Sequence, residues 1–159
     1  MKIKFIGGAG TVTGSKTLIE SNGVTILIDC GLFQGIKPLR ELNWEPLPVL
    51  PSTIDFVLLT HAHLDHYAWL PRLVHQGFND KIYCTRPTKD IAKLILLDSA
   101  KIQEEEANKA NEGHYSKHQI AKPLYTVEQA KQVFTLFRVV KVNEVVNLDA
   151  EIEAFFTNT

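Results

Sequence analysis

Residues 54–66 read IDFVLLTHAHLDH, an apolar run that passes directly into a cluster of metal-competent side chains. The first seven of these residues have the length and composition of a buried strand. His61 and His63 lie two apart in extended chain, so their side chains point the same way and can bind one ion, while Asp65 and His66 turn toward a second. Imidazole nitrogen and carboxylate oxygen suit zinc, and less selectively other first-row ions such as manganese. The spacing predicts a two-metal site at a strand end and disfavours exposed loop histidines.

Short β-rich runs separated by turn signals precede this stretch. KIKFI at 2–6, KTLIE at 16–20 and VTILID at 24–29 are typical of strands. Asn22-Gly23 between the last two is a strong hairpin signal, because both residue types tolerate positive φ. The chain is therefore expected to open as antiparallel β structure. Four prolines within residues 35–53 prevent a long helix there and favour a loop that covers another part of the fold.

Helices and strands alternate after the motif. In order, the sequence predicts a helix from about Asp65 that Pro71 limits, a strand over 81–85, a long helix from Pro87 to about Ala110, a helix with Thr126 as its N-cap, and further β structure over 139–156.

Composition limits the class of protein. The chain has 159 residues, of which 45% are hydrophobic and 22% charged, enough for one domain or most of one. Cys30 and Cys84 form no CxxC pair and no secreted disulfide framework, which favours a soluble protein of the reducing cytoplasm. No apolar run approaches the ~20 residues that cross a bilayer, so no membrane contact is expected. A net charge of -1 gives no basic footprint typical of a dedicated nucleic-acid-binding module.

The motif and three further stretches carry a family resemblance. THAHLDH at 60–66 is similar to the HxHxDH signature of the metallo-β-lactamase superfamily. GGAGTVTGS at 7–15, LIDCGLFQG at 27–35 and LPRLVHQG at 70–77 resemble the start of β-CASP proteins, a group that contains RNA-processing endonucleases and exonucleases. The resemblance implies an α/β fold, the four-layer metallo-β-lactamase sandwich of two sheets faced by helices, with residues 1–159 as its N-terminal portion.

The same resemblance implies a function. His61, His63, Asp65 and His66 would hold two zinc ions, and Asp65 is also the candidate catalytic residue. Asp29 would accept a hydrogen bond from a ligating histidine and hold its ring in place, although a turn-forming aspartate is the alternative. The implied reaction is hydrolysis of a phosphodiester in RNA, with DNA as an open alternative. The sequence does not identify residues that bind substrate.

The family's third histidine, bridging aspartate, β-CASP insertion and C-terminal half do not occur before Thr159. We therefore expect a truncated and inactive form with partial or absent metal, which self-associates, most simply as a homodimer through its C-terminal strands. Two other functions remain open. One is a hydrolase of the same fold that acts on a thioester, lactone or β-lactam. The β-CASP insertion would distinguish the nuclease from such a hydrolase. The other is a non-catalytic interaction module, which metal content would discriminate.

Three further features are ambiguous. Tyr67 stands where the family usually has a small residue, and it either narrows the substrate mouth or packs outward. The glycine-rich stretch 7–15 suggests dinucleotide binding, but a strand rather than a helix follows it, so this fingerprint is rejected. Two roles for this stretch are equal alternatives: its backbone amides approach a phosphate, or it forms a tight β-turn. His114 and His118 lack a carboxylate to complete a metal set and are interpreted as surface residues.

Overall fold

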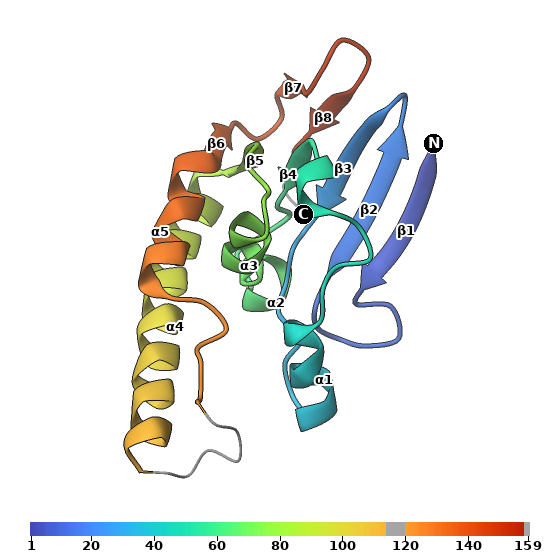
Figure 1. The fold of residues 1–159 in the computed structure, drawn as a ribbon. Coiled ribbons are helices and arrows are strands. Elements are labelled where there is room, and N and C mark those ends of the chain that lie inside the picture. Colours follow the sequence, from blue (N-terminus) through green and yellow to red (C-terminus); the bar gives the residue numbers. More distant parts are fainter. Residues whose placement is uncertain (114–119, 158–159) are drawn as a thin grey trace.

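A computed structural model describes residues 1–113 and 120–157, so His114 and His118 lie outside the described residues (Figure 1). A six-stranded sheet with the strand order β1-β2-β3-β4-β5-β6 forms its centre. The first two pairs of neighbouring strands are antiparallel and the last three are parallel. The strands are β1 (Lys2–Gly7), β2 (Lys16–Ser21), β3 (Val24–Ile28), β4 (Phe56–Leu58), β5 (Lys81–Thr85) and β6 (Phe137–Val140).

The predicted antiparallel opening is confirmed. Ser21 pairs with Val24 around a tight turn in which Asn22 has φ 50° and Gly23 has φ 81°. The strand expected over residues 54–60 is shorter than predicted. Its end leaves the sheet because the backbone N–H of Thr60 donates to the Asp29 carboxylate, at 2.9 Å, instead of to a neighbouring strand.

Short helices flank the motif and two longer ones follow it. Residues 35–53 contain only α1 (Lys37–Glu41) and two 3-10 turns, as the prolines predict, and this loop covers the buried Trp69, whose Nε1–H donates to the carbonyl of Asn43. The helix expected near Asp65 is divided into α2 (Leu64–Tyr67) and α3 (Leu70–His75), with Pro71 in the first turn of α3. The long helix α4 spans Arg86–Glu112, and α5 spans Val127–Leu136 with the predicted N-cap.

The two faces of the sheet are covered differently. Neighbouring residues of a strand point to opposite faces. Leu27 of β3 therefore lies in the core formed with α3, α4 and α5, while Ile26 packs toward a hairpin of β7 (Val145–Asn147) and β8 (Glu153–Phe155). In Figure 1, α4 and α5 accordingly lie on the left of the view, and the β7–β8 hairpin lies at the top. This mixed α/β arrangement agrees with the N-terminal portion of the predicted fold.

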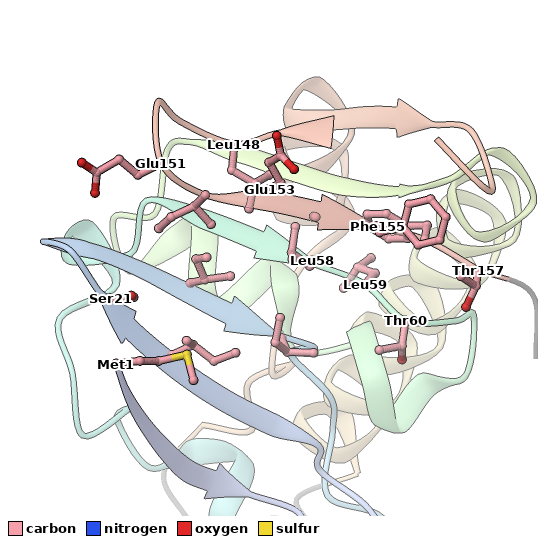
Figure 2. A pocket seen from close by; sticks show the side chains of 16 residues that line it. Met1, Ser21, Leu58, Leu59, Thr60, Leu148, Glu151, Glu153, Phe155 and Thr157 are labelled. Carbon is pink, nitrogen blue, oxygen red and sulfur yellow. The ribbon is translucent and has the colours of Figure 1, made fainter. Parts of the chain in front are cut away.

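A hollow of about 660 Å³ lies between the β3–β4 face and the β7–β8 hairpin (Figure 2). Leu58 lines it from β4, Thr60 from the segment after β4, and Leu148 and Phe155 from the hairpin segment. The hollow is mainly apolar and reaches Thr60, the residue before the metal-competent cluster. Within residues 1–113 and 120–157, no helix has the length and apolar character needed to span a membrane.

Candidate metal centre

Two parallel strands bring the candidate residues together. Ile28 of β3 is paired with Leu58 of β4, so the segments that follow the two strands leave the sheet at the same edge. Asp29 follows β3, and His61 follows β4 after two residues. His63 is then the N-cap of α2, which carries Asp65 and His66 in its single turn.

Asp29 connects the two strand ends. Only 3% of the residue is exposed, and its φ of 59° is a left-handed conformation that aspartate tolerates better than most residues. Its Oδ1 accepts from the backbone N–H of Thr60 at 2.9 Å. Its Oδ2 lies 2.7 Å from Nδ1 of His66. The carboxylate therefore fixes both the exit of β4 and the orientation of the His66 ring.

A chain of hydrogen bonds runs from Asp29 through the histidines. Because the carboxylate only accepts, the Thr60 hydroxyl donates to it, at 2.9 Å from Oδ2. Thr60 Oγ1 must then accept from Nδ1–H of His61, 2.9 Å away, which leaves Nε2 of His61 with a lone pair. His63 donates from Nδ1 to that lone pair, at 2.8 Å. These tautomers follow from the bonding inventory of each group.

The donor set fits zinc in its chemistry. The His61 and His66 ring centroids are 4.0 Å apart, and Asp65 Oδ2 lies 3.6 Å from Nε2 of His66. Within the described parts of the chain, no three of these side chains already surround a common ion position. His63 donates to Nε2 of His61 in this structure, so the His63 ring would have to turn for both side chains to bind one ion. The structure brings together all four predicted ligands, and their roles stay predictions.

Local electrostatics favour the neutral form of one histidine. Burial lowers the pKa of His61, and the neighbouring His66 and His63 lower it further. A metal ion binds the neutral imidazole. The lowered pKa of His61 therefore favours the form that binds a metal ion.

Gly31 allows the backbone after β3 to pass against the motif. The N–H of Cys30 donates to the carbonyl of His66 at 2.7 Å, and the N–H of Ser15 donates to the carbonyl of Asp65 at 2.9 Å. A Cβ on Gly31 would overlap the backbone oxygen of Asp65. Only glycine fits at this position without a shift of the segment that carries Asp65 and His66.

Tyr67 neither narrows a substrate mouth nor packs outward. Its side chain is fully buried in the helical core, and burial raises its pKa to about 12. Its hydroxyl has no hydrogen-bond partner among the described residues. Because α2 directs the residue after His66 away from the site, the Tyr67 ring packs in the hydrophobic core instead of facing a substrate.

Two residues of the site were not predicted from the sequence. Thr60 bridges Asp29 and His61, and its position directly before the first histidine was the available signal. Gly31 lies in the 27–35 stretch, which supported only the family resemblance, and its position two residues after Asp29 was the available signal.

Comparison with known proteins is consistent with this arrangement. Residues 9–145 match the family model described as the metallo-beta-lactamase superfamily. Ribonuclease TTHA0252 of Thermus thermophilus is 42% identical over 105 residues, which cover 66% of this chain and 24% of that protein. Transcription termination factor FttA of Methanocaldococcus jannaschii is 32% identical over 106 residues, covering 67% of this chain and 17% of that protein.

A plant relative gives a similar result. Cleavage and polyadenylation specificity factor subunit 3-I of Arabidopsis thaliana is 37% identical over 97 residues, covering 60% of this chain and 14% of that protein. The matched part of this chain thus spans a quarter or less of the length of each of these relatives.

Proposed function

Because this chain belongs to the metallo-beta-lactamase superfamily, we propose that it carries the metal-binding motif of an RNA phosphodiester hydrolase. The relatives include proteins named as a ribonuclease, an endoribonuclease and a cleavage and polyadenylation specificity factor subunit. They confirm the resemblance to β-CASP RNA nucleases. The observation that carries the proposal is the gathering of three imidazoles and two carboxylates where β3 and β4 end.

Each residue of the cluster has a proposed role. His61, His63, Asp65 and His66 would hold two zinc ions, with manganese as an alternative. Such ions, when bound, supply an activated water and stabilise charge on the attacked phosphorus. Asp65 is also the candidate catalytic residue, because its Oδ2 lies within the cluster, 3.6 Å from Nε2 of His66. Asp29 holds the His66 ring, so that Nε2 rather than Nδ1 faces outward.

We further propose that residues 1–159 form the N-terminal part of a metallo-β-lactamase-fold domain. The six-stranded sheet with helices on one face and a β-hairpin on the other supports this assignment. Cys30 and Cys84 are both free and buried, which is compatible with the reducing cytoplasm that we propose as the location.

Zinc titration of the chain tests the metal site. Calorimetry should show that His61→Ala and His63→Ala each weaken zinc binding by at least ~10-fold, since loss of a group that merely supports a ligand costs that much. His75→Ala is the matched control, because His75 is an exposed histidine outside the cluster. Equal affinity in the wild type and both motif variants would contradict the proposal.

RNA experiments test the substrate class. The affinity for a single-stranded RNA should rise with added zinc and fall in His63→Ala. We expect no appreciable turnover, because four candidate ligands give two to each ion and catalytic zinc usually has three. Hydrolysis of a lactone, thioester or β-lactam without affinity for RNA would favour the other hydrolase function, and failure to bind zinc would favour an interaction module.

We also propose self-association through the β7–β8 hairpin. Val145 and Phe155 are directly paired across its two strands, and both are more than half exposed, at 56% and 57%. In the described part of the chain this sheet has only two strands, so β7 and β8 each have one partner strand. Unpaired strand edges beside exposed apolar side chains favour pairing with a second copy.

A further inference from the structure

A second hollow, of about 470 Å³, opens on the β1 side of the motif. Its lining includes His66, so it is continuous with the candidate metal centre. The volume falls within the ~300–1,000 Å³ typical of sites for small molecules. The other main lining residues are Phe5, Gly7, Gly8, Ser15 and Thr17.

Bare backbone forms one wall of this groove. A Cβ on Gly7 would overlap the carbonyl oxygen of Gly14, and Gly8 has φ 79°, which disfavours any residue with a side chain. The wall is tied to the motif, because the N–H of Ser15 donates to the carbonyl of Asp65 at 2.9 Å. The groove and the metal centre therefore keep a fixed relation to each other.

An exposed aromatic ring also lines the groove, two residues before Gly7 on the same strand. Phe5 is 69% exposed although it lies within a strand. It pairs directly with Thr17 of β2, so the ring and the Thr17 side chain project from the same face of the sheet. The exposed phenyl ring offers a flat apolar surface next to the glycines. The hydroxyl groups of Ser15 and Thr17 add polar groups at its margin.

We propose that this groove binds the base of a nucleotide next to the scissile phosphate of single-stranded RNA, with Phe5 as the stacking platform. The inference rests on the proposed function and specifies how that site holds its substrate. Bases of single-stranded RNA stack on aromatic side chains, and this contact tolerates any base because every base has a π-face. Among the described residues, the groove lining contains no acidic or basic side chain other than His66, which suits a base better than a phosphate.

Fluorescence anisotropy with a short labelled RNA and the zinc-loaded chain tests the proposal. Phe5→Ala should weaken the affinity about five- to 150-fold, the range for loss of one base stack, whereas Phe5→Trp should retain it. Ile3→Ala is the matched control, because Ile3 is an exposed apolar residue two positions earlier on the same strand face and outside the groove. An abasic oligonucleotide of equal length should bind the wild type and Phe5→Ala equally.

The outcomes separate this inference from the proposed function. If RNA binding depends on zinc and on His63 but Phe5→Ala binds as tightly as the wild type, the base subsite is wrong and the proposed function stands. If RNA binding is independent of zinc and of His63, the proposed function fails and the subsite with it. If Phe5→Ala abolishes self-association at unchanged RNA affinity, the groove is a contact between two copies and the inference is overturned.

Discussion

At the scale of single residues, Asp29 connects the two strand ends, because it accepts from the N–H of Thr60 and holds Nδ1 of His66 so that Nε2 of His66 faces outward. The family resemblance implied that Asp29 contacts a ligating histidine, but not which histidine it is. The spacing of His61, His63, Asp65 and His66 was sufficient to bring them to one strand end. The contact between Asp29 and His66 joins residues 37 positions apart, and it depends on the pairing of β3 with β4, which local spacing does not encode. The direction of each ring depends further on the bonding capacity of the Thr60 hydroxyl.

Gly31→Ala tests the close packing beneath the motif. The added methyl group would meet the backbone oxygen of Asp65, so we expect a loss of ~1–3 kcal/mol in the free energy of unfolding, as for other overpacked sites. Zinc affinity should fall as well, because the segment carrying Asp65 and His66 must shift. Urea unfolding and calorimetry measure the two effects. Gly10→Ala is the control, since nothing lies near its Cβ and any loss there comes from its positive φ of 74°, which Gly31 does not share.

Lys16 predicts a pH dependence of stability. It is 2% exposed, donates to the carbonyl of Gly31, and lies over the rings of Phe33 and Trp69. Burial lowers the pKa of Lys16 below its ordinary value of 10.5, an effect that nearby Cys30 partly opposes. The unfolded chain then binds more protons between the lowered pKa and 10.5, so the contribution of Lys16 to stability rises with pH across that window.

Urea unfolding of the wild type and Lys16→Met at several pH values up to 10.5 measures this effect. Their difference in unfolding free energy should move in favour of the wild type as pH rises. Lys101→Met, at an exposed lysine, controls for the general loss of a positive charge. A difference that stays constant or moves the other way would show that the Lys16 ammonium is not penalised by its surroundings.

At the scale of elements, local sequence signals predicted which helices, strands and turns are present better than they predicted where each one ends. The Asn22-Gly23 turn and the start of α5 were predicted correctly, because each depends on the chemistry of a few neighbouring residues. The strand ending before His61 was predicted too long, since tertiary contacts with Asp29 end its pairing. The split between α2 and α3 likewise depends on a tertiary contact, in which the N–H of Trp69 donates to the carbonyl of Cys30 at 2.9 Å.

The N-cap of α5 gives an element-scale prediction. The Thr126 hydroxyl accepts from the N–H of Gln129, and the Gln129 side chain accepts from the N–H of Thr126. Thr126→Ala removes one half of this capping box and should lower the free energy of unfolding by ~1 kcal/mol. Thr135→Ala, an exposed threonine in the same helix, should have a smaller effect. Denaturant unfolding of both variants would refute the prediction if the two losses were equal.

At the scale of the whole molecule, the described part of the chain packs α2, α3, α4 and α5 against one face of the sheet and the β7–β8 hairpin against the other. The sequence indicated both kinds of element, but not that a mainly apolar hollow of about 660 Å³ would lie between the sheet and the hairpin. That feature depends on how far apart the two layers sit, a property of side-chain packing over many residues.

The proposed self-association is tested at this scale. Light scattering over a concentration series should show that the wild type forms dimers, while Phe155→Glu, which places a charge at the exposed end of β8, should remain monomeric. Leu94→Glu is the matched control, because Leu94 is 71% exposed on α4, away from the hairpin. A wild type that stays monomeric at high micromolar concentration would exclude the hairpin as a contact between copies.

The mixed topology of the sheet also has a consequence for the order of folding. Strands β1, β2 and β3 are joined by short connections, whereas the parallel pairing of β3 with β4 closes a loop of 27 residues between Ile28 and Phe56. Local hairpins form in microseconds, and non-local pairing is slower because loop closure opposes it. Zinc affinity should therefore appear only when the two halves of the sheet meet. A zinc-sensitive dye followed during refolding would time that event, and early uptake, before β4 is protected from hydrogen exchange, would exclude this order.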